Sequence, residues 1–498
     1  MKKIIFTITA LLIGGFSIAQ KGYEYKFKVK GAESDSVAYL ANFYGNKQYY
    51  NDTAVVNAKG EFVFKSKSEK KPGGIYSVVM QDKKSIFQFV VAEDEVAMET
   101  AKPDLTGNMK IKKSEENRVF YEYMKKMNQL QPAVQQLVQQ RDATEDKDLK
   151  KELKKKIEDQ TAEADEWRDA FFEKHDGMFI TKVLKASKDP EIPEEVKNDA
   201  DSTAQYRYYR KNFFKFVDLS DDRLIRTPVL HNKIDYYITK LTPQVPDSVC
   251  AAAKHIIDRT SGDSSLIFKY VVQHVTNVYE KSKMMGMDAV FVCMAEEYYM
   301  EGKAFWLDST QFESIADHYT KRKRQVVGVK AENLILPTPE GEWTSMYDIE
   351  KDYTILVFWD PKCGHCKREL PKLKKFHDEW NDEVAVYSVS TSLHNEDWEK
   401  FIEEKELHNF INVSDNPDIN KEAATFIQSK ITTYNSLNFR DYWDIYSTPQ
   451  LYVLDKDKKI IAKRLGAEQL DDFISQHKKQ SGTKNEGDVI QMEIVPEE

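Results

Sequence analysis

The pattern of apolar and polar positions first changes near residue 114. Over residues 22–113, short apolar runs alternate with charged residues and are separated by turn-forming sequences such as 57–60 and 72–74. Alternation with a period of two, broken by frequent turns, is typical of short β-strands. This part of the chain predicts a small β-sandwich. Its many aromatic residues are interpreted as core and cross-strand packing.

Over residues 114–320 the apolar positions recur at helical spacing instead. The first stripe runs from Val119 to Val138, and Pro132 is expected to kink or break that helix. After a loop at 188–203, helical spacing resumes. The pattern predicts a central all-α region whose methionines and aromatic residues serve packing.

Strand-like and helix-like segments alternate over residues 326–479. Predicted strands at 353–359, 384–390 and 410–413 are each followed by a helical pattern, and a hairpin is expected near 451–465. This alternation predicts an α/β domain with a mixed sheet. The polar tail, residues 480–498, is expected to be disordered.

The clearest chemical signal is the sequence Cys-Gly-His-Cys at residues 363–366. It lies where the predicted strand 353–359 ends and a helical pattern begins. A helix N-terminus stabilises a thiolate, which is the attacking form of cysteine. With two residues between them, the two thiols can close a disulfide. Cys363 is therefore predicted to be the exposed attacking thiol and Cys366 the thiol that resolves the intermediate.

Length and charge limit the remaining possibilities. The 498 residues are enough for about three domains. The net charge is −9 with acidic and basic residues interleaved, so no concentrated basic face for nucleic acid is expected. A short basic run at residues 321–324 is interpreted as a solvated linker.

The N-terminus has the pattern of a cleavable signal peptide, residues 1–19. Two lysines precede an apolar core at 4–18, and a small-x-small cleavage site occupies 17–19. No later apolar stretch is long enough to span a membrane. The mature protein is predicted to be exported to the periplasm or cell envelope.

Two further cysteines, Cys250 and Cys293, lie in helical sequence. Two separate buried thiols are the favoured interpretation, since free cysteine is often buried; a structural disulfide between them is the alternative. No second pair of ligands accompanies residues 363–366, so neither a zinc site nor another cofactor is predicted.

Several motifs around the dithiol carry a resemblance to a known family. Trp359 stands four residues before Cys363, Pro371 follows the dithiol in the predicted helix, and Thr448-Pro449 opens a later strand. Together with the Cys-x-x-Cys motif, they make residues 326–479 resemble the TlpA/ResA-like thioredoxin-fold oxidoreductases of the bacterial envelope. The β-sandwich and helical region resemble the upstream parts of multidomain proteins of that kind.

The resemblance implies a site on both sides of the dithiol. Thr448 and Pro449, with a cis peptide bond between them, would form the edge that binds an extended client segment, and Trp359 would also contribute to substrate binding. The bond exposes backbone groups of Thr448 beside the thiols.

The resemblance also implies how the thiols are tuned. Thioredoxins proper carry a buried Asp where this chain has Val357. In the ResA-like branch a Glu three residues after the second Cys takes its place, so Glu369 is the predicted proton acceptor. His365 is expected to stabilise the Cys363 thiolate.

The function implied is that of an exported thiol–disulfide oxidoreductase whose only redox group is the Cys363–Cys366 pair, with reduction of clients the preferred direction. Clients would be proteins with cysteines or disulfides, including apocytochromes, and electrons would come from a membrane thiol transporter. An envelope binding or scaffold module with an accessory dithiol is the alternative. A peroxidase is disfavoured, because Asp360 stands where those enzymes carry a Thr.

Overall fold

The computed structural model describes residues 22–415 and 417–482. The predicted signal peptide lies outside these residues, and so does most of the predicted tail. Residues 480–482 belong to the last helix rather than to a disordered tail. The chain divides into two compact units, Met1–Tyr236 and Tyr237–Glu498. This division runs through the stretch for which the sequence predicts one helical region.

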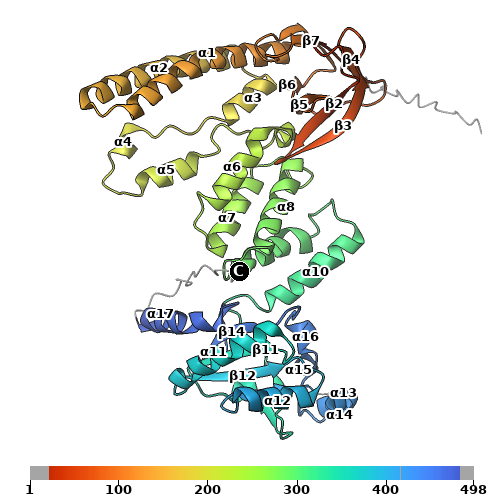
Figure 1. Ribbon diagram of the computed structural model, residues 1–498, viewed down its shortest axis with the longest axis vertical. Helices are drawn as coiled ribbons and strands as arrows, with labels where there is room; N and C mark the ends of the chain where they lie inside the picture. Colours follow the sequence, from red (N-terminus) through yellow and green to blue (C-terminus); the bar gives the residue numbers. More distant parts are fainter. Residues whose placement is uncertain (1–21, 416, 483–498) are drawn as a thin grey trace, which may run out of the picture. The chain divides into compact units, whose positions relative to one another are not determined.

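The first unit begins with eight strands in two four-stranded sheets (Figure 1). One sheet has the order β4-β1-β7-β8 and the other β3-β2-β5-β6. The strands are β1 (Tyr23–Lys30), β2 (Val37–Tyr44), β3 (Lys47–Val55), β4 (Glu61–Ser66), β5 (Gly74–Met80), β6 (Ile86–Val91), β7 (Glu95–Ala101) and β8 (Lys110–Lys113). The predicted sandwich is confirmed.

Aromatic side chains from both sheets meet in the sandwich core. Phe27 of β1 packs against Phe62 and Phe64 of β4 and against Phe87 and Phe89 of β6, with ring centroids 5.1–6.1 Å apart. All five rings are buried. The alternating burial pattern of β1 places Phe27 on the face that packs against the other sheet. The sequence interpretation of the aromatic residues as core is therefore correct.

Helices make up the rest of the first unit. They are α1 (Glu115–Ala143), α2 (Lys147–Lys174), α3 (Phe179–Ala186), α4 (Glu194–Lys197), α5 (Ala204–Asn212), the 3-10 helix η1 (Asp222–Arg226) and α6 (Pro228–Thr239), which crosses into the second unit. Ser114 caps α1, because its hydroxyl accepts a hydrogen bond from the N–H of Asn117. α1 continues past Pro132, so the expected break does not occur.

The second unit starts with further helices. These are α7 (Pro246–Ile257), α8 (Leu266–Glu280), α9 (Asp288–Met294), the π-helix η2 (Ala295–Met300) and α10 (Ser309–Lys323). Cys250 of α7 and Cys293 of α9 form a disulfide, with their Cα atoms 6.6 Å apart. The favoured prediction of two separate thiols is therefore wrong. The two helices pack against each other, and sequence spacing carries no information on that approach.

The basic run 321–324 is not a solvated linker. It forms the end of α10, and its Lys321 is ion-paired with Asp317 (3.0 Å) and Asp441 (2.9 Å). The guanidinium of Arg324 lies over the Tyr442 ring, 4.4 Å from its centroid. Cations in the last turn of a helix are favoured by its dipole, and here they also bind the domain that follows.

That domain is built on a five-stranded sheet of order β13-β12-β11-β14-β15. β11 and β12, like β12 and β13, pair in parallel, whereas β14 is antiparallel to both β11 and β15. A small hairpin of β9 and β10 precedes the sheet. The strands are β9 (Ile335–Pro337), β10 (Trp343–Ser345), β11 (Tyr353–Trp359), β12 (Val384–Ser390), β13 (Ile411–Ser414), β14 (Gln450–Asp455) and β15 (Ile460–Lys463).

Each face of this sheet packs on its own cluster of apolar side chains. One cluster includes residues of α11, α12 and α17. The other includes residues of the opening hairpin and of α16. The helices are the short η3 (Met346–Asp348), α11 (Gly364–Trp380), α12 (Asn395–Lys405), α13 (Pro417–Lys421), α14 (Ala423–Gln428), α15 (Tyr434–Leu437), α16 (Phe439–Tyr442), η4 (Ala467–Gln469) and α17 (Leu470–Gly482). The predicted class, a β-sandwich, a helical region and an α/β domain, is confirmed.

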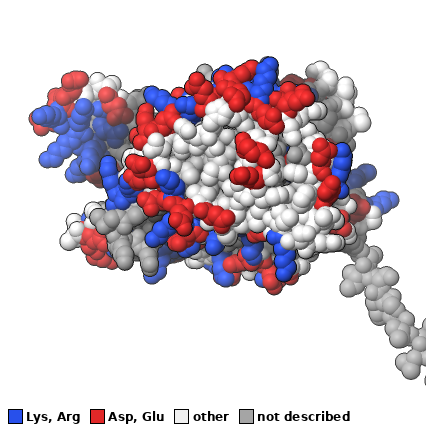
Figure 2. Space-filling model, turned by 90° about the horizontal axis from the view of Figure 1, so that it is seen from below, with Lys and Arg blue, Asp and Glu red and all other residues white. Residues whose placement is uncertain are grey.

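Charge is unevenly spread over the surface at the end of the second unit that carries α12, α13 and α14. Figure 2 shows that face with a broad area of uncharged residues, a few acidic side chains within it, and charges of both signs around its margin. Within residues 22–415 and 417–482, none of the helices combines the length and the apolar character needed to cross a lipid bilayer.

Candidate active site

The turn from β11 into α11 places the two cysteines. Every residue of β11 is buried, which fixes the end of the strand inside the domain. The chain then turns at Asp360, whose carbonyl accepts a hydrogen bond from the N–H of Cys363 (3.0 Å). Cys363 is the residue before the first turn of α11, and Cys366 lies within that turn on the buried side of the helix. The sequence prediction of a dithiol at a strand-to-helix junction is confirmed.

The two thiols differ in exposure and in acidity. Cys363 is partly exposed, and Cys366 is fully buried. Burial by itself raises the pKa of the Cys363 thiol. Hydrogen bonds from the backbone N–H of Cys366 and from the Thr448 side chain outweigh this effect, so the pKa lies below its usual value. Burial raises the pKa of the Cys366 thiol to about 12. Only Cys363 therefore has both access to a client and a readily formed thiolate.

Thr448 and Pro449 lie next to the dithiol and are joined by a cis peptide bond, as the resemblance implies. The Cys363 thiol donates a hydrogen bond to the backbone carbonyl of Thr448 (3.1 Å). The backbone N–H of Thr448 has no hydrogen-bond partner in the part of the chain that the structure describes. A free donor beside the attacking sulfur can bind the backbone of an extended segment.

His365 acts on Cys363 through its backbone. The N–H of His365 is one of the groups that lower the pKa of the Cys363 thiol. The imidazole is exposed, and its Nδ1 accepts a hydrogen bond from Arg368 (2.8 Å). That the imidazole also stabilises the thiolate stays a prediction.

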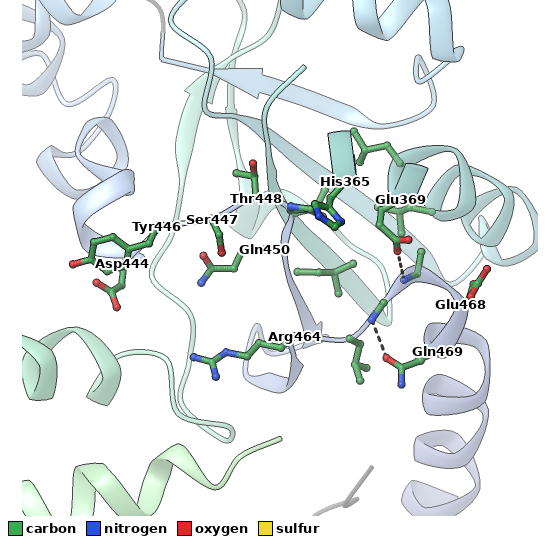
Figure 3. Close-up of a pocket in the computed structure, with 18 of the residues that line it drawn as sticks. His365, Glu369, Asp444, Tyr446, Ser447, Thr448, Gln450, Arg464, Glu468 and Gln469 are labelled. Carbon is green, nitrogen blue, oxygen red and sulfur yellow. Dashed lines mark hydrogen bonds between the residues drawn. The ribbon is translucent and has the colours of Figure 1, made fainter. Parts of the chain in front are cut away.

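Glu369 is anchored rather than solvated. Its Oε2 accepts a hydrogen bond from the N–H of Ala467 (3.1 Å), which Figure 3 shows as a dashed line. Its Oε1 accepts a hydrogen bond from Lys372 (3.0 Å). The side chain is 20% exposed. No hydrogen bond joins it to either thiol within residues 22–415 and 417–482, so its role as proton acceptor stays a prediction.

Trp359 lies beneath the site rather than in it. The side chain is fully buried, its indole N–H donates to the Ser388 hydroxyl (2.7 Å), and its ring packs on Phe401. The prediction that Trp359 contacts substrate is wrong. Because β11 is buried on both faces, a tryptophan at its end is enclosed by the helices that cover the sheet.

A cleft of about 1020 Å³ opens beside the dithiol. Thr448, Pro449, His365 and Glu369 line it, so the structure brings these predicted residues to one place. Sequence reasoning missed several other lining residues, which come from the chain on both sides of the cis bond, from the segment after β15 that includes η4, and from α10: Asp444, Tyr446, Gln450, Arg464, Glu468, Gln469, His318 and Arg322. In the sequence Arg464 is the second of two adjacent cations after an apolar run, and this pattern does not single it out as a site residue.

The helices of the second unit hold the edge of this site through a buried ion pair. Lys463 of β15 binds Asp288 of α9, with side-chain exposures of 5% and 7%. The same ammonium donates to the backbone carbonyl of Gln325 (2.7 Å), and Tyr452 of β14 donates to the side chain of Gln325 (2.7 Å). Removing two such charges from water is costly unless they are paired, so these contacts fix the position of β15.

Three family models match this chain, and their bounds are close to those of the β-sandwich, the helical region and the α/β domain. A model described as the AhpC/TSA family matches residues 327–463. This match is confined to the C-terminal part of the chain, which has a thioredoxin-like fold. Upstream, two models described as domains of unknown function match residues 23–120 (DUF4369) and 140–324 (DUF5106).

The thioredoxin-like domain is similar to several named proteins. The thioredoxin-like protein YneN of Bacillus subtilis is 33% identical over 63 residues, which are 13% of this chain and 37% of YneN. The thiol-disulfide oxidoreductase ResA of Halalkalibacterium halodurans is 27% identical over 78 residues, 16% of this chain and 44% of ResA. The chain thus spans less than half the length of each of these two relatives.

A solved structure is similar over the same part of the chain. It is a domain of a possible thiol-disulfide isomerase from Cytophaga hutchinsonii, 41% identical, with a TM-score of 0.27. The similarity covers 32% of this chain and 97% of that domain. Of the two relatives, ResA is named as a thiol-disulfide oxidoreductase and YneN as a thioredoxin-like protein, in agreement with the resemblance found in the sequence.

Proposed function

We propose that this protein is an exported thiol–disulfide oxidoreductase that exchanges disulfides with client proteins through Cys363 and Cys366. The observation that carries the proposal is the difference between the two thiols. One is accessible with a lowered pKa, and the other is buried with a raised pKa. In such a pair, the accessible thiol attacks the client and the buried thiol resolves the intermediate.

The proposed reaction runs in two exchanges. The Cys363 thiolate attacks a client disulfide, a protein–client disulfide forms, and the other client sulfur leaves as a thiolate that takes a proton. Cys366, after losing its proton, attacks the sulfur of Cys363 and releases the second client thiol. Two electrons pass to the client, and Cys363 and Cys366 end as a disulfide. That disulfide is the only redox group that the proposal requires.

The client would bind as an extended segment along Thr448. The free N–H of Thr448 supports this, because it offers one backbone hydrogen bond next to the attacking sulfur. A strand-like contact of this kind fixes the direction of the client chain and aligns its sulfur with Cys363.

Glu369 is proposed to accept the proton that Cys366 must lose. A thiol with a pKa near 12 needs such a group to react at neutral pH. Glu369→Gln should slow the second exchange about a hundredfold, the low end of what a positioned base contributes. Glu468→Gln is the matched control, because Glu468 also binds Lys372 (3.2 Å) but is 70% exposed. Equal rates in the two variants would remove Glu369 from the mechanism.

The location, direction and partners are also proposals. The pattern of residues 1–19 supports export to the periplasm or cell envelope. The resemblance to TlpA/ResA-like proteins supports reduction of clients, apocytochromes among them, with a membrane thiol transporter as the electron donor. A reduction potential of the Cys363–Cys366 pair near or below about −250 mV would favour this direction, and one near about −150 mV would favour oxidation.

Trapping tests the proposal most directly. Cys366→Ala removes the resolving thiol, so clients should remain attached to Cys363 as disulfides that dithiothreitol releases. The double variant Cys363→Ala/Cys366→Ala should trap nothing. If envelope extracts yield the same species with both variants, or none with either, the oxidoreductase proposal fails.

A further inference from the structure

Arg464 is an unusual residue at the edge of the cleft. It follows β15 directly, and its backbone N–H binds the carbonyl of Leu451 (2.9 Å). Its φ is +60°, in the left-handed region that glycine and asparagine adopt more readily. The chain therefore carries a long cationic side chain where the backbone disfavours one. Residues held in a disfavoured backbone conformation are often found at ligand-binding sites.

The guanidinium of Arg464 is free to act on a ligand. The residue is exposed, and within residues 22–415 and 417–482 its side chain has no hydrogen-bond or ion-pair partner. In Figure 3 the side chain extends from the end of β15 towards the side of the cleft on which Asp444 and Tyr446 lie. Tyr446 is 80% exposed and adds apolar surface there.

The acidic groups nearest the dithiol are held by one lysine. Glu369 and Glu468 share the ammonium of Lys372, at 3.0 and 3.2 Å. Their charge is therefore reduced but not cancelled, and both carboxylates are already engaged with a cation.

The arginine that α10 contributes to the cleft is compensated. Arg322 lies 3.7 Å from the Glu280 carboxylate and also donates to the Glu280 backbone carbonyl. Among the described residues, Arg464 differs from Arg322 in having no such partner.

The remaining carboxylate of the cleft, that of Asp444, is less accessible to a client. Its Oδ1 is buried and has no hydrogen-bond partner among the described residues. No ion pair joins Asp444 to Arg464 in the same part of the chain. Because one oxygen is shielded, Asp444 presents less of its charge at the surface than the exposed guanidinium does.

The position of Arg464 along the sheet sets its reach. It lies beside Leu451, three residues beyond Thr448. At about 3.3 Å per residue of strand, this is about 10 Å from the point at which a client would pair. A client side chain within about three residues of the reacting cysteine would therefore meet the guanidinium.

We propose that Arg464 selects clients that carry an Asp or Glu within about three residues of the reacting cysteine. The inference rests on the proposed function and gives its client class. A guanidinium binds a carboxylate through two parallel hydrogen bonds, which supplies both charge and direction. Arg464 is a specificity residue here and takes no part in electron transfer.

Peptide substrates test this directly. The substrates are extended peptides with one cysteine held as a mixed disulfide with glutathione. In each peptide a single Asp occupies one of the three positions before or the three positions after that cysteine. Its control is the same peptide with Asn in place of the Asp. The second-order rate of peptide-thiol release by the reduced full-length protein should be about threefold to fivefold higher for the best Asp position, as expected for a partly exposed ion pair. The preference should shrink at 0.5 M salt.

Three variants complete the experiment. Arg464→Asn, which tolerates the positive φ, should lose the preference, and Arg464→Lys should keep part of it. Lys459→Asn is the matched control, since it removes one exposed cation at the other end of β15 and should leave the preference intact. The reduction potential of the dithiol should be the same in all variants.

The outcomes separate the two proposals. If the unaltered protein reduces none of the peptides, the proposed function fails. If it reduces all of them at one rate, the function stands and the role of Arg464 is overturned. A faster reaction of the Asn peptide than of every Asp peptide would mean that the cleft repels carboxylates and would equally overturn it.

Discussion

Alkylation of the reduced protein should label Cys363 far faster than Cys366. A pKa of about 12 leaves about one part in 10⁴ of Cys366 as thiolate at pH 8. The pKa of Cys363 is lowered from the ordinary value of 9.0, so at least about one-tenth of that thiol is ionised at the same pH. Ionisation alone therefore favours Cys363 about a thousandfold. The more basic thiolate is intrinsically more reactive, by about 30-fold over three pKa units. The net preference is at least about 30-fold, and the full burial of Cys366 adds to it.

The assay is a time course with iodoacetamide at pH 7 to 10, read by peptide mass spectrometry. The Cys363 rate should rise with pH and level off below 9, because its thiolate is favoured at lower pH than usual. The Cys366 rate, measured in Cys363→Ser, should still be rising at pH 10. The Cys366→Ser variant should retain the fast reaction. Rates for the two cysteines within threefold of each other at pH 8, or a faster Cys366, would refute the assignment of attacking and resolving thiol.

Three further predictions concern stability and are read as the free energy of unfolding in urea, followed by tryptophan fluorescence. Asp288→Asn, which leaves the Lys463 ammonium buried without its anion, should cost about 3–5 kcal/mol, and Asp288→Leu with Lys463→Met should recover most of it. Cys250→Ala with Cys293→Ala should cost about 4 kcal/mol, from a disulfide that joins positions 43 residues apart; an unchanged stability would indicate that the thiols are not paired. Ser388→Ala should cost about 1–3 kcal/mol, because it leaves the buried indole N–H of the neighbouring tryptophan without an acceptor.

Much of the fold was predictable because it is recorded in local periodicity. A period of two gave the sandwich strands, and helical spacing gave α1, although the sequence overestimated the effect of Pro132. A proline within a long helix removes one hydrogen bond, and the rest of the helix holds the two sides in line. The dithiol and the Thr448-Pro449 pair were also predictable, since each is a short motif at the end of a strand.

Other features depend on which side chains packing brings together. The burial of Trp359 follows from the helices that cover β11, and its neighbours in the sequence do not show whether the ring faces solvent or core. The partner of Glu369, the N–H of Ala467, lies 98 residues further along the chain. No local pattern carries such a pairing.

The sequence by itself determined the order of three structural regions, the thiol pair at a strand-to-helix junction and the Thr448-Pro449 motif at the start of a strand. These depend on residues close together in the chain, whose spacing sets secondary structure and motif. Only the tertiary structure decided that Cys250 and Cys293 pair, that Lys463 and Asp288 are buried together, and that Arg464 lines the cleft. Disulfides, buried ion pairs and clefts are made by approach in space, which the linear order of residues does not record.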